Sequence, residues 1–295
     1  LCDEDGEVAY PGAVDDWFNL LNRGHRIIGT GTSDSHDAHD HPGAGRSYVY
    51  VGHDDPGAVS PADIVAGVRS GRVLATTGPF VEFSVNGQPM GSDVVVGEAR
   101  TVQARFALRT PKWIKVDEAV IWGNGEVILA VGAGNDLAPC SDSPEALCWN
   151  WSGDLTLTQD TWLVLEVQGK TSMFPIQRPV DLPPILIQDA LSSFAEPLGL
   201  LEANYGDLTA ERVGQVVPTA ITNPIWIDVG EAGFEAPWAF DENGVQTRGQ
   251  TPRCVFNDAG ESLFHALVPD EDEVLGTEEQ ALKTRSPFQP SFGHP

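Results

Sequence analysis

The pattern of hydrophobic and polar residues changes near residue 78. Before this point, apolar residues at helical spacing predict two helices, over residues 15–22 and 61–70. Short apolar runs predict two strands, over residues 26–32 and 47–51. Ser60 and Pro61 are typical of the start of a helix, and Gly71 is typical of the position after its end. The first 78 residues therefore have an α/β texture.

Beyond Gly78-Pro79, alternating and β-branched runs predict a series of strands: 80–85, 101–109, 116–122, 127–131, 155–158, 162–167, and a region over 216–229 interrupted at Asn223-Pro224. Asn86-Gly87 and Asn124-Gly125 are typical of tight hairpin turns. Residues 79–235 are therefore expected to form an antiparallel β-sandwich, with one possible helix over 187–194. Residues 236–295 are expected to form an extended acidic tail. The fold class predicted for the chain is mixed and mainly β.

The charge of the chain is one-sided. Among its 295 residues, 17 Lys and Arg stand against 43 Asp and Glu, giving a formal net charge of −26. Such a chain repels phosphate backbones and anionic lipids, which argues against nucleic acid and membrane surfaces as partners. No apolar run approaches the length of a membrane span.

Cysteine usage and the N-terminus bear on location. Cys140 and Cys148 bracket a short polar loop and could close a disulfide, whereas Cys2 and Cys254 could pair only if the fold brings them together. The chain begins at Leu1 without a basic-then-apolar signal, so we expect a processed or incomplete N-terminus. Together with the low lysine content, these features favour an extracytoplasmic location, periplasmic or secreted.

The strongest chemical signal follows the predicted strand over residues 26–32. A strand directs residues i and i+2 to one face, so Asp34 and His36 would point the same way from its end. A carboxylate and an imidazole are half of a metal site. Alternatively, Asp34 caps the next segment and His36 is an ordinary loop histidine.

More ligand-type residues follow in the same loop. Residues 33–41 contain three His and three Asp, so His39 and His41 are accessory candidates for a metal. The simpler interpretation is that these two histidines are solvated. Arg46 could meet an anionic group of a substrate, or form a surface salt bridge.

Two further features have simpler explanations. Residues 228–235 alternate oxygen donors as a calcium loop does, but lack the spacing of an EF-hand and fit a plain acidic turn. Five tryptophans could stack on sugars, but their positions on or beside strands favour packing in and around the core: Trp113, Trp122, Trp149, Trp151 and Trp162. The sequence lacks the Gly-x-Ser-x-Gly elbow of serine hydrolases and the phosphate loop of P-loop enzymes.

Five phrases in order resemble one family. They are DWFNLLNRG (16–24), GTSDSH (31–36), GRVLATTGPF (71–80), VNGQPMG (85–91) and PTAITNPIWID (218–228). Together they resemble the C-terminal portion of a CehA/McbA-type metallohydrolase, of the polymerase-and-histidinol-phosphatase (PHP) superfamily.

This resemblance implies a fold and an activity. Members have a distorted α/β barrel whose mouth holds a multinuclear cluster of divalent metals, followed by a β-sandwich. Residues 1–78 would be the end of such a barrel, with Asp34 and His36 as metal ligands. Zinc, manganese or iron would activate water to hydrolyse a small ester-like substrate, a phosphoester or a carbamate.

The chain departs from the family in one respect. The His-x-His and other early ligands of the family would lie upstream of Leu1, and His39, His41 and His53 follow the last motif. We therefore expect a hydrolase in the intact protein, with a further N-terminal barrel segment as partner, and an inactive chain in isolation. The alternative is a non-catalytic β-sandwich module that binds a glycan or a partner protein.

Overall fold

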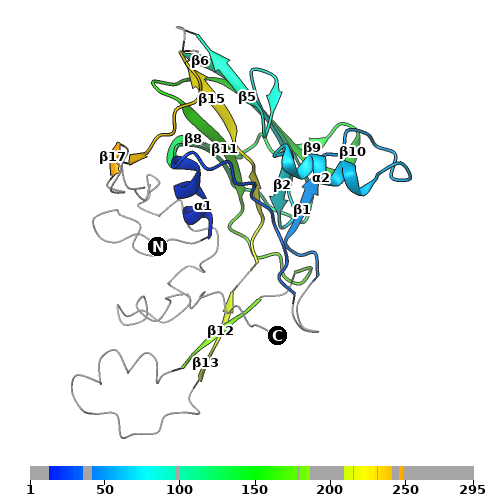
Figure 1. Cartoon of the computed structure of the whole chain (residues 1–295). Coiled ribbons are helices and arrows are strands. Elements are labelled where there is room, and N and C mark those ends of the chain that lie inside the picture. Colours follow the sequence, from blue (N-terminus) through cyan, green and yellow to red (C-terminus); the bar gives the residue numbers. More distant parts are fainter. Residues whose placement is uncertain are drawn as a thin grey trace, which may run out of the picture. The chain divides into compact units, whose positions relative to one another are not determined.

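The computed structural model describes residues 13–35, 42–97, 100–177, 180–186, 209–214, 216–230, 232–240 and 246–248. The chain divides into two compact units, Leu1–Gln177 with Val217–Ala266, and Arg178–Val216 with Leu267–Pro295. The described residues are mainly β (Figure 1). The predicted helix over 187–194, the tail beyond 248, and Cys2 and Cys254 lie outside them.

The larger sheet of the first unit has eight strands. Its main order is β1 (Arg46–Val49), β2 (Val73–Thr76), β14 (Thr219–Thr222), β11 (Thr161–Gln168), β15 (Ile225–Val229) and β5 (Asp93–Val96). On the other edge of β11 lies β7 (Glu118–Gly123), which also pairs with β8 (Glu126–Gly132). Neighbours are antiparallel except β15 and β5, which are parallel.

Strands β14 and β15 follow one another along the same edge of β11, with Glu166 opposite Ile221 and Leu163 opposite Ile225. The predicted interruption at Asn223-Pro224 is confirmed, since both residues lie between the two strands. The sheet divides at this point, because β2 pairs with β14 and β5 pairs with β15.

The second sheet has five strands in the order β4 (Gln88–Pro89), β3 (Phe80–Val85), β6 (Thr101–Pro111), β10 (Ser143–Thr156) and β9 (Ala138–Cys140). Burial alternates along β3 and β6, so this sheet buries one face. Residues 161–167 of β11 are all buried, so the centre of the larger sheet is covered on both faces. Two mainly antiparallel sheets with these burial patterns fit the expected β-sandwich. A disulfide joins Cys140 to Cys148, as the sequence allowed.

Two helices belong to this unit. Helix α1 (Ala13–Asn22) lies beside β8 and β11 in Figure 1 and inserts Phe18 and Leu21 into a core cluster with Trp122, Trp162 and Trp226. Helix α2 (Pro61–Arg69) begins with a capping box. The Ser60 hydroxyl accepts from the Asp63 backbone, and the Asp63 carboxylate accepts from the Ser60 backbone. Both helices confirm the sequence predictions.

The strand predicted over residues 26–32 is wrong. The segment is extended between α1 and β1 but joins no ladder. The prediction over 155–158 was too short, because β10 begins at Ser143 and pairs with β6 from Ala146 to Thr156. Strands β2 and β5 were not expected. Strands β1 and β2, from the first 78 residues, belong to the same sheet as β14. The α/β barrel and the domain boundary at residue 78 remain predictions.

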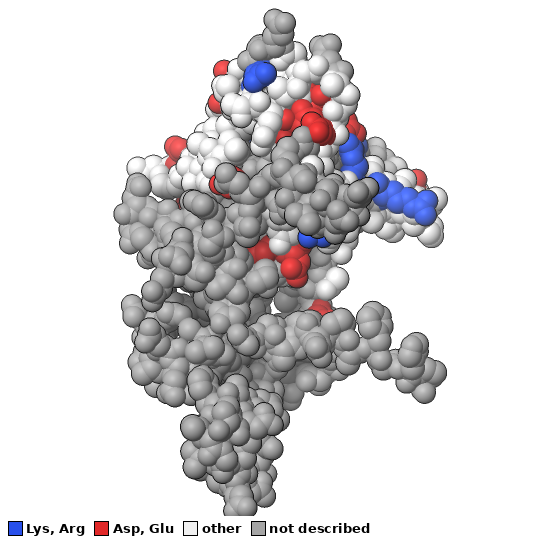
Figure 2. Space-filling model, turned by 60° about the vertical axis from the view of Figure 1, so that its left-hand side comes forward, with Lys and Arg blue, Asp and Glu red and all other residues white. Residues whose placement is uncertain are grey.

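Two short hairpins complete the description. In the second unit, β12 (Val180–Leu186) pairs with β13 (Thr209–Gly214), and in the first unit β16 (Ala239–Phe240) pairs with β17 (Gln246–Arg248). Within the described part of the chain, no helix has the length and apolar character needed to cross a bilayer. On the face shown in Figure 2, described acidic and basic side chains occur in several separate places.

Candidate functional site

The extended segment Arg26–Thr32 is held in place by side chains rather than by a neighbouring strand. The Asn223 amide accepts from the Gly29 N–H at 2.8 Å and donates to the Gly29 carbonyl at 2.9 Å. The Ser47 hydroxyl likewise accepts from the Gly31 N–H and donates to the Gly31 carbonyl, both at 2.9 Å. Each side chain therefore satisfies both backbone groups of one glycine, as a strand partner would.

The same amide group ties this segment to the larger sheet. Asn223 is 1% exposed and also donates to the carbonyl of Val73, on β2, at 2.8 Å. On the other side, the Trp17 indole of α1 donates to the Ile27 carbonyl at 2.9 Å. Helix α1 and the split between β14 and β15 therefore determine together where the segment runs and where Asp34 emerges.

Asp34 is exposed and begins a loop whose two ends are joined. The Ser33 hydroxyl accepts from the Gly43 N–H and from the Ser35 hydroxyl, each at 3.0 Å. At Gly45, an added Cβ would lie 2.5 Å from the Thr32 carbonyl oxygen, so the two ends of the loop are in contact. The carboxylate of Asp34 is thus carried at the start of a closed loop.

The backbone of Asp34 corrects the geometric argument for a shared face. Its φ of 47° lies in the left-handed region, which Asp tolerates better than most residues. The alternation of an extended strand therefore stops before Asp34, and the i and i+2 rule does not relate it to His36. His36, His39 and His41 lie outside the described residues.

Arg46 stabilises the far end of this loop. One of its terminal nitrogens donates to the carbonyls of Gly43 and Ala44, at 3.1 and 3.4 Å. Its Nε donates to the Tyr48 hydroxyl at 3.3 Å, and its guanidinium lies 5.5 Å from the centre of the Tyr48 ring. The structure therefore gives Arg46 a role in loop geometry, and its contact with a substrate anion stays a prediction.

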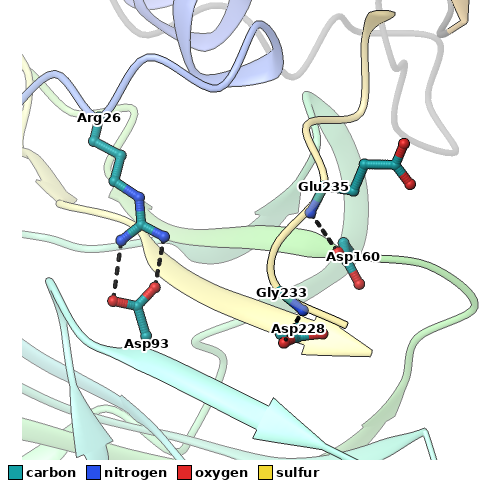
Figure 3. A network of polar contacts seen from close by, with 6 residues as sticks. All are labelled: Arg26, Asp93, Asp160, Asp228, Gly233 and Glu235. Carbon is teal, nitrogen blue, oxygen red and sulfur yellow. Dashed lines mark hydrogen bonds and ion pairs between the residues drawn. The ribbon is translucent and has the colours of Figure 1, made fainter. Parts of the chain in front are cut away.

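A small cavity lies at the other end of the extended segment. Its volume is about 120 Å³, and it is lined by Arg26, Ile27, Ile28, Arg69, Ser70, Gly71, Gly91, Pro224 and Trp226. Arg26 is committed to structure there, because it forms a bidentate pair with Asp93 at 2.6 and 3.0 Å (Figure 3). Its guanidinium also lies 4.6 Å from the centre of the Trp226 ring. A cavity of this volume can hold a few water molecules.

The backbone of the acidic turn over residues 228–235 donates to two carboxylates, one from the turn itself and one from Asp160. Asp228 accepts from the Gly233 N–H at 2.8 Å, and Asp160 accepts from the Glu235 N–H (Figure 3). Asp160 also accepts from the Val229 N–H at 2.7 Å. Across the described ranges, no group of three or more His, Cys, Asp or Glu side chains is placed to hold a metal ion. These contacts are those expected of a plain acidic turn.

Most of the tryptophans considered for sugar stacking belong to the core. Trp122, Trp149 and Trp162 are each 1% exposed or less, as core packing predicts. Trp151 stacks on Phe106 with ring centres 5.7 Å apart. Among the five, only Trp113 is a large exposed aromatic, at 50%. The platform they would form together is therefore not present.

Comparison with known proteins gave no relative. A scan against protein-family models, a search of curated proteins and a search of solved structures each returned no match. The resemblance to the metallohydrolase family therefore remains an inference from the motifs of this sequence.

A buried carboxyl group beneath α1 was not singled out from the sequence. Glu166 is 5% exposed and accepts a 2.8 Å hydrogen bond from the Trp122 indole. Its pKa is raised from 4.5 to about 7, mainly because burial disfavours the charged form. The hydrogen bonds from Trp122 and Gln168 oppose this rise, and the charges of Glu118 and Asp15 add to it. The available signal was one Glu inside the apolar run Trp162–Val167.

Proposed function

We propose that this chain contributes Asp34 and His36 to the divalent-metal centre of a hydrolase that acts on a small ester-like substrate, a phosphoester or a carbamate. The observation that carries the proposal is the way hydrogen bonds hold the backbone on both sides of Asp34. An exposed carboxylate stands at the start of a closed loop, directly after a segment held by Asn223 and Ser47. Such preorganisation suits a metal ligand, which must be held in position before the ion arrives.

The chemistry of the two residues fits this role. A carboxylate and a neutral imidazole are ligands for zinc, manganese and iron. A metal of this kind lowers the pKa of bound water toward about 7, which supplies hydroxide for attack on a phosphoester or carbamate. Asp34 would hold the metal, and Asn223, Ser47 and Ser33 would position the backbone that carries it.

Two ligands do not make a multinuclear centre. The proposal therefore includes further ligands from an N-terminal barrel segment, as the family resemblance implies, with His39 and His41 as accessory ligands. It also includes an extracytoplasmic location, which the Cys140–Cys148 disulfide supports. In isolation, this chain is expected to show no appreciable turnover.

The test is the metal content of the purified chain after equilibration with zinc, manganese or iron. The double variant Asp34→Ala/His36→Ala is expected to lose metal that the wild type retains. The matched control is His53→Ala/Asp54→Ala, which removes the same two residue types from exposed positions outside the loop. Equal metal in the wild type and the Asp34/His36 variant, or equal loss in both variants, would refute the assignment.

One observation favours the alternative of a binding module. Tyr48, Tyr50 and Phe80 are 42, 53 and 40% exposed, and the Arg72 guanidinium lies 3.7 Å from the centre of the Tyr50 ring. Exposed tyrosines beside arginines are typical of recognition surfaces. In a glycan-array or pull-down assay, this function predicts binding that Tyr50→Ala weakens and Trp113→Ala leaves unchanged. Binding unaffected by Tyr50→Ala would exclude this surface.

A further inference from the structure

Glu166 is buried on β11, and the charge of Asp15, on the helix that leads into the candidate site, acts on it. Its strand, β11, is buried on both faces. Trp122, which belongs to the core cluster with Phe18 and Trp162, is in direct contact with Glu166. The hydrogen bond from the Trp122 indole to Oε2 forms within this apolar layer. A carboxylate in such a place is costly when ionised, because little of its lost hydration is replaced.

The charged groups that act on Glu166 share its sign. Asp15 comes from the first turn of α1 and is 8% exposed, and Glu118 comes from the neighbouring strand β7. On the other side, β14 places Ile221 opposite Glu166. The cluster therefore contains three carboxyl groups from three elements. Ionisation of Glu166 adds charge repulsion to its cost of burial.

Helix α1 packs against the aromatic core cluster, which includes Trp122, the hydrogen-bond donor to Glu166. Phe18 packs with ring centres 4.9 Å from Trp162 and 5.7 Å from Trp122. At the end of the helix, the Trp162 indole donates to the Asn22 side-chain oxygen at 2.8 Å, and the Trp238 N–H donates to the Asn22 carbonyl at 2.9 Å. Undocking α1 would bring water to Glu166 and release both contacts of Asn22.

We propose that α1 is a proton-controlled docking element, held on the sheet while Glu166 is protonated and loosened when Glu166 ionises against Asp15 and Glu118. Helix α1 continues into the segment Arg26–Thr32, and its Trp17 holds the Ile27 carbonyl. Loosening α1 therefore also loosens the segment that positions Asp34. This last link, the regulation of a metal centre, rests on the proposed function, whereas the docking equilibrium does not.

The direction of the effect follows from proton linkage. Docked, Glu166 has a pKa of about 7, and in an undocked state open to water its pKa falls toward 4.5. The docked state holds the proton more tightly, so docking is strongest at acidic pH and weakens as pH rises between these two values. Above the docked pKa, both states are ionised and the dependence levels off. The full change in the opening constant is about two orders of magnitude.

The experiment is amide hydrogen exchange of the full chain between pH 5 and pH 8, read at residues 18–22. After the intrinsic pH dependence of exchange is divided out, the opening constant of the wild type is expected to rise by one to two orders of magnitude, roughly as linkage requires. Glu166→Gln retains an acceptor for Trp122 and should remove this rise. Glu126→Gln, at an exposed position on β8, is the matched control and should keep it.

A second variant keeps the test decisive if Glu166→Gln does not fold. Asp15→Asn removes one of the two carboxylates that act on Glu166, so it should lower the pKa of Glu166 in the docked state. The pH-dependent rise of the opening constant should then end at a lower pH. A flat opening constant in the wild type, or the same rise in Glu166→Gln, overturns the proposal. Metal content is measured separately at one fixed pH, so a chain that binds no metal but shows the rise would refute the proposed function alone.

Discussion

The side chain of Asn223 makes the most informative single target, because it joins the segment before Asp34 to the larger sheet. We predict that Asn223→Ala lowers the free energy of unfolding by about 3 kcal/mol, from three lost hydrogen bonds that average about 1 kcal/mol. Their lengths are 2.8 Å from Gly29 N–H, 2.9 Å to the Gly29 carbonyl and 2.8 Å to the Val73 carbonyl. Ala offers no replacement for any of them.

The three bonds do not contribute equally. The bond to the Val73 carbonyl is buried, whereas the two to Gly29 are partly buried, so water can replace some of what Gly29 loses. The loss is therefore expected to arise mainly from the unsatisfied Val73 carbonyl and from the freed segment.

Urea unfolding followed by tryptophan fluorescence measures the effect, with an unchanged m-value expected because the folded core keeps its extent. The control is Asn150→Ala, which removes an exposed asparagine from β10 and should change stability by less than about 0.5 kcal/mol. In the same samples, the Gly29 amide should exchange faster in Asn223→Ala. A loss below about 1 kcal/mol with Gly29 still protected would refute the reasoning.

Three further predictions concern the core and its chemistry. Since the folded pKa of Glu166, about 7, lies above its ordinary 4.5, wild-type stability should fall by about 3 kcal/mol as pH rises through this window. Glu166→Gln should show no such fall in unfolding titrations, and a parallel fall would contradict the assignment. Phe18→Ala should lower the free energy of unfolding by about 3–5 kcal/mol, measured by denaturation, because it leaves a cavity where α1 packs against Trp122 and Trp162. Cys140→Ser/Cys148→Ser should cost about 2 kcal/mol, since the bridge closes a short loop with a separation of 8, and an unchanged melting temperature would argue against it.

Local signals predicted several elements well. Ser60 and Pro61 mark the start of α2, and the structure shows the capping box there. The Asn86-Gly87 and Asn124-Gly125 turns lie between β3 and β4 and between β7 and β8. In each case, the features involved span a few neighbouring residues, so they can be read from the sequence alone.

Other elements depend on pairing between distant residues. Strand β10 contains Pro144, Asn150, Gly153 and Asp154, which are poor strand signals, yet it pairs with β6 from Ala146 to Thr156. The short strand β5 is parallel to β15, more than a hundred positions later in the chain. Its four residues carry too little pattern to reveal such a partner.

The candidate site shows the same division. The residue types after the apolar segment, an Asp and several His, can be read from the sequence and predict a metal site. The expected strand and the shared face of Asp34 and His36 rested on an ideal extended backbone, and the left-handed φ of Asp34 ends that extension. Periodicity describes a regular element but does not say where the regularity stops.

What could be read from the sequence is what neighbouring residues decide: the two helices, most strands, the turns and the excess of acid. What required the folded chain is what distant residues decide. Asn223 replaces a strand partner for Gly29 across a separation of 194 residues. The high pKa of Glu166 arises because α1 and β7 surround it with apolar and acidic groups. Both effects depend on burial and on distances between segments, which no local pattern encodes.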